Sequence, residues 1–218
     1  MSLIPYINIH THHISKDNGV FLFNNRFGFD DKLYLEKYFS VGIHPWDGRL
    51  DSSVSELEKI IADKNCLAIG ECGLDKLIEV DMEVQKKVFI SQLDLAVKYQ
   101  KPVIIHCVKA FDELIDICKP YQMYVPLIIH GFNKSHQLAK QLIEQGFYIS
   151  LNPSVFKKND FDFNEVPLEK LFLETDDNVF ISIKEVYKTA AVHFKIAEED
   201  LKEKIYCNFT PLFKDYGR

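Results

Sequence analysis

Short apolar runs alternate along the chain with longer segments in which apolar residues recur every three or four positions. The short runs are rich in β-branched residues and predict strands at residues 6–9, 20–23, 39–43, 66–69, 102–105, 126–129, 147–151 and 171–173. Several of them are apolar without interruption, which is typical of parallel strands buried on both faces. The longer segments predict helices at residues 54–62, 81–99, 110–118, 135–144 and 183–194.

The order of these elements predicts an α/β fold class. Strands that alternate with helices form βαβ units. Eight strand segments favour a closed (β/α)8 TIM barrel over an open doubly wound sheet. Neither a G-x-G-x-x-G nor a G-x-x-x-x-G-K-[ST] motif follows a strand segment, and this weakens the alternative of a nucleotide-binding α/β fold.

Composition places the chain among ordinary globular proteins. Hydrophobic residues make up 47% and charged residues 27% of the 218 positions, which excludes a disordered or fibrous chain. No apolar run approaches the ~20 residues of a membrane-spanning helix, and the first residues lack the pattern of a signal peptide. Five cysteines without a C-x-x-C pair favour a reducing compartment. We expect one domain over residues 1–218, cytoplasmic and monomeric, with no obligate protein partner.

Histidines and carboxylates gather where the predicted strands end. Five of the eight histidines follow strand segments, and so do one glutamate and one aspartate: His10, His12, His44, Glu71, His106, His130 and Asp176. In a (β/α)8 barrel the carboxyl ends of the strands converge on one mouth, where active sites lie. The spacing of His10 and His12 puts both imidazoles on one face of a strand, so that both can reach one ion.

This set of side chains predicts a metal site. Any one of them taken singly has a simpler explanation, such as a hydrogen-bonded histidine near a loop or a helix-capping carboxylate, but their joint placement favours metal binding. Imidazole with carboxylate suits Zn²⁺, Mn²⁺ or Fe²⁺, and less obviously Mg²⁺, which prefers oxygen. Six candidate ligands exceed what one tetrahedral ion takes, so two ions ~3.5–4 Å apart, bridged by a carboxylate, fit better.

The barrel is predicted to be shortened near its start. A (β/α)8 barrel takes about 250 residues, or about 31 for each unit. His12 and His44 are 32 positions apart, although they should enclose two units. Because a parallel crossover needs about a dozen residues or more, we expect the first crossover helix, between residues 13 and 20, to be reduced or absent.

Six short motifs carry a resemblance to a known family. In order they are N-I-H-T-H at residues 8–12, V-G-I-H-P at 41–45, A-I-G-E-C-G-L-D at 68–75, K-P-V-I-I-H at 101–106, I-I-H-G-F at 128–132 and L-E-T-D at 173–176. Together the chain resembles the TatD-type metal-dependent deoxyribonucleases, which belong to the amidohydrolase-like TIM barrels. The resemblance implies a hydrolase that cleaves DNA phosphodiester bonds with a metal-activated water.

The resemblance also implies a role for each ligand. His10 and His12 would bind one ion, and His106 and His130 would bind the second. Glu71 would bridge the two ions, while Asp176 would ligate the first ion and act as the base for the attacking water. The formal net charge of −6 would repel an anionic substrate such as DNA. Two divalent ions would add four positive charges at the mouth itself, where the substrate approaches.

Four further residues receive supporting roles. Glu174 and Asp75 would lie behind the ligands and fix imidazole tautomers. His44 matches a family position at the mouth, where contact with a substrate phosphate is expected. Trp46, two positions further on, would stack on a base or sugar.

Departures from the family pattern concern the substrate. Where family members commonly have arginine two residues after the fifth-strand histidine, this chain has Val108, so a phosphate contact is lost or passes to Lys109. Two alternatives to a DNase therefore stay open. One is a metal-dependent hydrolase of a small-molecule ester, amide or phosphate ester, and the other is a non-catalytic binding protein built on the barrel.

Overall fold

Eight parallel strands form one sheet whose order in space is their order along the chain. The structure is a computed structural model, and it describes residues 4–13, 19–26, 38–48 and 53–217. The strands are β1 (Tyr6–Thr11), β2 (Gly19–Arg26), β3 (Phe39–Gly42), β4 (Cys66–Asp75), β5 (Val103–Val108), β6 (Leu127–Phe132), β7 (Tyr148–Leu151) and β8 (Leu171–Leu173). All eight predicted strand segments are present.

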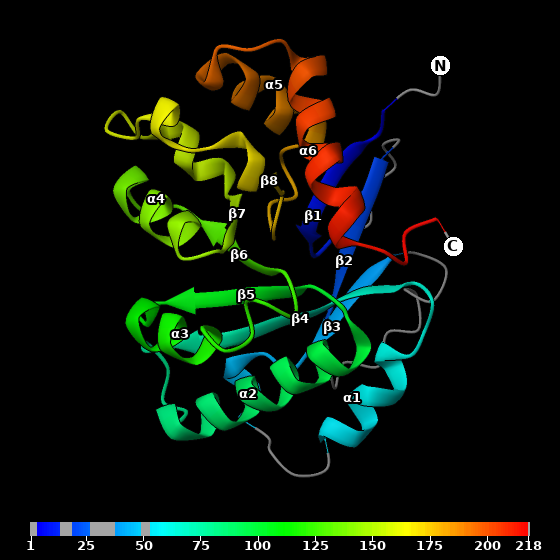
Figure 1. The fold of residues 1–218 in the computed structure, drawn as a ribbon. Coiled ribbons are helices and arrows are strands. Elements are labelled where there is room, and N and C mark those ends of the chain that lie inside the picture. The colour runs from blue at the N-terminus through cyan, green and yellow to red at the C-terminus, as the bar shows by residue number, and fades with distance from the viewer. Residues whose placement is uncertain (1–3, 14–18, 27–37, 49–52, 218) are drawn as a thin grey trace.

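The sheet closes where the first strand meets the segment after the last. Thr11 and Asp176 form a parallel bridge. The His12 amide donates to the Asp176 carbonyl at 3.0 Å, and the Asp176 amide donates to the His10 carbonyl at 3.1 Å. We call this junction of residues 10–12 with residue 176 the seam. It completes the predicted (β/α)8 barrel (Figure 1).

Helices cover the outside of the barrel. They are α1 (Ser53–Ile61), α2 (Met82–Tyr99), α3 (Phe111–Cys118), α4 (His136–Glu144), α5 (Ile183–Phe194) and α6 (Glu198–Leu212). Figure 1 shows α1, α2 and α3 on the side of β3 to β5, with α5 and α6 across the barrel from them. Within the described part of the chain, no helix combines the length and the apolar character needed to cross a membrane.

The last helix was not predicted from the sequence. Leu201, Ile205 and Phe209 recur at every fourth position of α6 and are fully buried, so the helix has the expected apolar stripe. The neighbouring α5 is tied to β1 by Tyr187, whose hydroxyl donates to the Ile7 carbonyl at 2.9 Å and accepts from the Ile7 amide at 3.1 Å. These two helices cover the outside of the barrel near the seam.

Several strands are longer than their apolar runs indicated. β4 continues from residue 69 to Asp75, so that Glu71 lies inside the strand rather than after it. His10, His106 and His130 likewise lie within the last residues of β1, β5 and β6. The strands run on into the mouth because these polar residues are themselves members of the sheet.

The connection from β1 to β2 is short. Only residues 12–18 separate the two strands, whereas three turns of α-helix take about eleven residues. The predicted loss of the first crossover helix falls largely on residues 14–18, which lie outside the described residues.

A cavity of about 380 Å³ lies beside β1, against the segment 178–183 at the start of α5.

Candidate metal centre

Glu71 lies at the centre of the mouth. Its Oε1 is 2.8 Å from His106 Nδ1, 2.8 Å from His130 Nε2 and 3.2 Å from His44 Nε2. The residue is only 6% exposed, so these imidazoles replace water around the carboxylate. Strands β5 and β6 and the segment after β3 therefore direct ring nitrogens onto one carboxylate oxygen.

Glycines on either side of Glu71 let β4 pass close to β5. A Cβ atom on Gly73, whose φ is +148°, would lie 2.0 Å from the carbonyl oxygen of His106, and one on Gly70 would lie 2.3 Å from that of Ile104. No side chain fits in either place. The G-E-x-G spacing thus brings Glu71 and His106 together from neighbouring strands.

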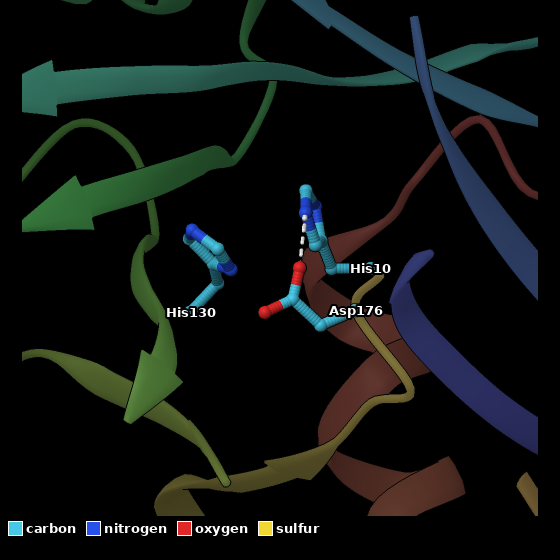
Figure 2. A group of neighbouring side chains, drawn as sticks. All are labelled: His10, His130 and Asp176. Atoms are coloured by element: carbon cyan, nitrogen blue, oxygen red, sulfur yellow. Dashed lines mark ion pairs between the residues drawn. The ribbon is translucent and has the colours of Figure 1, made fainter. Parts of the chain in front are cut away.

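A second group of side chains faces the other oxygen of Glu71. His10 Nε2 and His12 Nε2 lie 3.2 Å apart, and Glu71 Oε2 is 3.6 Å from the first and 3.8 Å from the second. Asp176 Oδ1 lies 3.6 Å from His10 Nε2 and 3.5 Å from His12 Nε2. Figure 2 shows His10, His130 and Asp176 converging from β1, β6 and the segment after β8.

Two more carboxylates lie behind the imidazoles. Asp75 Oδ2 is 3.6 Å from Nε2 of His106, the ring nitrogen that faces away from Glu71. Glu174 Oε1 is 3.6 Å from Nδ1 of His130 and accepts the Gly131 amide at 2.7 Å. A carboxylate behind an imidazole orients the ring and keeps the lone pair of its other nitrogen toward the centre.

The charges of the site leave room for a cation. Burial, aided by His130, lowers the pKa of His10 to about 3, so its imidazole is neutral near pH 7. Burial lowers the pKa of His130, but Glu71 and Glu174 outweigh it and raise that pKa well above its ordinary value. Burial raises the pKa of Glu71, but the charge and hydrogen bonds of the histidines outweigh it and hold that pKa well below normal. His130 thus keeps a proton, and with it a positive charge, between the carboxylates of Glu71 and Glu174. A metal ion can supply this positive charge in place of the proton.

The donor set fits divalent metal ions. Ligand atoms within 4.8 Å of one another occur in three groups: His10 with His130 and Asp176; His10 with His12 and Glu71; and His44 with Glu71 and His106. Glu71 belongs to the second and third groups, His10 belongs to the first and second, and the three groups together draw on all six predicted ligands and His44. Imidazole nitrogens mixed with carboxylate oxygens suit Zn²⁺ or Mn²⁺ better than an all-oxygen site would.

The predicted substrate contacts lie at the edge of the same mouth. His44 Nδ1 accepts the Trp46 amide at 3.2 Å, so its Nε2 is the nitrogen that faces Glu71. Trp46 is 55% exposed, and its Nε1 donates to Asp75 Oδ2 at 2.9 Å. Lys109 is exposed at the end of β5 and has a φ of +53°. Contact of these three side chains with a substrate stays a prediction.

Two asparagines at the site were missed by the sequence analysis. Asn24 Nδ2, from β2, donates to Glu71 Oε2 at 3.0 Å. Asn152, which follows β7, donates through Nδ2 to Asp176 Oδ2 at 3.3 Å. Both lie at carboxyl ends of strands, the same positional signal that indicated the candidate ligands, but asparagine is common in loops and the signal is weak without a structure.

Comparison with known proteins identifies the family to which this architecture belongs. A (β/α)8 barrel with a histidine–carboxylate cluster at its strand ends defines a metal-dependent hydrolase. Residues 29–214 match the family described as TatD related DNase. The chain belongs to that family.

Individual relatives agree with this assignment. The chain is 28% identical over 193 residues to the uncharacterized metal-dependent hydrolase YcfH of Escherichia coli K12, covering 80% of this chain and 73% of that protein. It is 32% identical over 156 residues to the 3'-5' ssDNA/RNA exonuclease TatD of Salmonella typhimurium, covering 66% of this chain and 59% of that protein. The crystal structure of YJJV, a TatD homologue of E. coli K12, superimposes with a TM-score of 0.84 at 21% identity over 97% of this chain and 99% of the other, which shows the same fold.

Proposed function

We propose that this protein is a hydrolase that cleaves phosphodiester bonds of DNA with two divalent metal ions, and that it acts as a single domain. The observation that carries the proposal is the arrangement around Glu71, whose two oxygens face two separate groups of imidazoles. The residues that would hold the ions are His10, His12 and Asp176 for the first, His106 and His130 for the second, and Glu71 for both. We infer Zn²⁺, Mn²⁺ or Mg²⁺ as the ions.

The chemistry divides between the ions and the side chains. When bound, two divalent ions lower the pKa of a water and neutralise charge on phosphoryl oxygens. Asp176 directs Oδ1 toward the histidine pair, and its carboxylate accepts the proton of the attacking water. Its pKa is lowered because the hydrogen bond to His12 and the charges of nearby histidines outweigh burial. The carboxylate is therefore ionised at neutral pH, which is the state that a proton acceptor requires.

Substrate binding would use the edge of the mouth. Trp46 offers an exposed indole face already fixed through its Nε1, and exposed aromatic rings bind unpaired bases by stacking, at about 1–3 kcal/mol each. Lys109 and His44 would contact phosphate groups. We expect Trp46→Ala to raise KM for single-stranded DNA by about 5- to 100-fold with a smaller change in kcat.

The decisive experiment compares substrates on the purified protein and on two variants. DNA, RNA and a chromogenic phosphodiester are assayed with the wild type, Glu71→Ala and Asp176→Asn after each has been shown to fold by circular dichroism. Loss of DNA hydrolysis in both variants supports the proposal, and unaltered hydrolysis in both contradicts it. DNA turnover should also fall steeply with salt if phosphates are bound through charge.

A small-molecule ester, amide or phosphate ester is the second candidate substrate. Val108 occupies a mouth position at the end of β5 and has no group that can bind a phosphate. Rapid turnover of the chromogenic ester with none of DNA or RNA would favour this candidate. Stoichiometric metal binding without hydrolysis of any substrate would instead indicate a binding protein.

A further inference from the structure

Asn24 makes a two-point contact with the central carboxylate from a strand that carries no ligand-type residue. Strand β2 reads G-V-F-L-F-N-N-R and holds no His, Cys, Asp or Glu. The Asn24 side chain donates through Nδ2 to Glu71 Oε2 at 3.0 Å and accepts the Glu71 amide on Oδ1 at 3.1 Å. Asn24 is 5% exposed, so water competes little for either bond.

The contact fixes both ends of Glu71. One bond holds its backbone, and the other holds the oxygen that faces His10 and His12. A flexible glutamate loses side-chain rotamer freedom when it is immobilised. A contact that orders the carboxylate in advance removes part of that cost from metal binding.

The chemistry of an amide suits this task. A carboxylate oxygen has two lone pairs, and a hydrogen bond from Nδ2 uses one and leaves the other for an ion. A cation at this position would repel the metal ions, and a second carboxylate would repel Glu71. Asparagine supplies a neutral donor and a neutral acceptor at the two points where Glu71 needs them.

We propose that Asn24 is a positioning residue that orients Glu71 and thereby sets the affinity for the divalent ions. The proposal rests on the proposed function in one respect, the role of Glu71 as the shared ligand. It assigns a role at the mouth to β2, the strand beside the shortened connection. Asn24 would act through its two hydrogen bonds to Glu71 and not as a ligand itself.

Metal titration tests this role without an activity assay. Mn²⁺ is titrated by calorimetry into metal-free wild type, Asn24→Ala and the control Asn208→Ala, and thermal unfolding of the metal-free proteins is recorded in parallel. Asn208 is also a bridging amide, donating to the carbonyls of Leu168 and Leu171 at 2.7 and 3.0 Å, but it lies at the amino end of β8, away from the mouth.

We expect Asn24→Ala to weaken Mn²⁺ binding by about 10- to 100-fold, the usual effect of removing a group that orients a ligand. Asn208→Ala should lower the unfolding temperature and leave the Mn²⁺ affinity unchanged. Catalysis by Asn24→Ala should recover partly at high Mn²⁺, because the ligands themselves remain. If Asn24→Ala fails to fold, Asn24→Ser, which removes the same two-point contact, takes its place in the titration.

Two results would overturn the inference: wild-type affinity in the Asn24 variant, or an equal loss of affinity in Asn208→Ala. Failure of the proposed function looks different. If the wild type binds Mn²⁺ but hydrolyses no DNA, the proposed function is refuted, while the effect of Asn24→Ala on Mn²⁺ affinity persists. If the wild type hydrolyses DNA and Asn24→Ala binds Mn²⁺ with normal affinity, only the role of Asn24 is refuted.

Discussion

The two halves of the metal centre differ in how far they are withdrawn from solvent. Around Glu71, His106 and His130, the side chains are 14% exposed or less. At the seam, the side chain of His10 is fully buried, but that of His12 is 37% exposed and that of Asp176 is 20% exposed. The buried half is built to hold its ligands in place, whereas the seam half opens to solvent, where water and a substrate can enter. We infer that binding is concentrated on one side and proton transfer on the other.

Removal of the shared carboxylate should give the largest effect. Glu71→Ala takes one ligand from each half, so we expect both ions to bind weakly and phosphodiester hydrolysis to fall by at least about 10³-fold, or about 4 kcal/mol. Metal content after gel filtration and kcat/KM measure the two losses. Normal metal content with normal activity would show that neither half depends on Glu71.

Asp176→Asn should separate the halves. The amide keeps a ligand oxygen but is a far weaker base, so we expect kcat to fall by about 10²–10⁴-fold while metal content changes much less. Single-turnover kinetics at saturating Mn²⁺ make this measurement, with Glu71→Ala as the comparison. A loss of metal as large as that in Glu71→Ala would mean that the seam half also serves mainly to hold ions.

Metal removal tests how far the ions stabilise the fold. Dialysis against a chelator should lower the free energy of unfolding by about 2.7 kcal/mol for each ion removed, relative to protein at a metal concentration of 100 times Kd. Denaturant unfolding with and without Mn²⁺ provides the values. In the metal-free protein, amides around Asp176 should exchange hydrogen faster than those around Glu71, because the buried half has more internal contacts. Equal exchange rates would contradict the expected difference between the buried half and the seam half.

The smallest effect is expected at Asn152. Its Nδ2 holds Asp176 Oδ2 at 3.3 Å, and a hydrogen bond of this kind to a charged group contributes about 1.5–3 kcal/mol at most. We expect Asn152→Ala to lower kcat by about 10-fold, the lower end of that range, and to leave the Mn²⁺ affinity unchanged. Asn208→Ala serves again as the control, and an affinity loss in Asn152→Ala would show that the seam half also sets metal binding.

The sequence predicted the eight strands because buried parallel strands are apolar on both faces and so stand out as continuous runs. It underestimated their length because the pattern stops at the first polar residue, whereas His10, Glu71 and His130 continue their strands. The missed helix α6 has Pro211 near its end and many charged residues, which dilute its apolar stripe.

The convergence of the candidate ligands on the mouth was predictable because histidine and carboxylate at the ends of separate strands are rarely needed for packing. Asn24 was not, since its role depends on a contact with Glu71 across 47 positions of the chain. Nor does sequence show that His44 would face Glu71 while its other ring nitrogen accepts the Trp46 amide. Such contacts depend on the strand register at the mouth. Apolar patterning shows where a strand lies in the sequence but does not show its register with its neighbours.

The seam has a consequence for the order in which the protein folds. Thr11 and Thr175, whose hydroxyl groups meet at 3.1 Å, are 164 positions apart, and contacts of such long range carry the largest loop-closure entropy and form late. The β4, β5 and β6 part of the mouth needs contacts of much shorter range. A partly folded chain, including one still being synthesised, would therefore possess Glu71 with its histidines but not the His10–His12–Asp176 group. Hydrolytic competence would arise only in the last step of assembly, when the two ends of the barrel join.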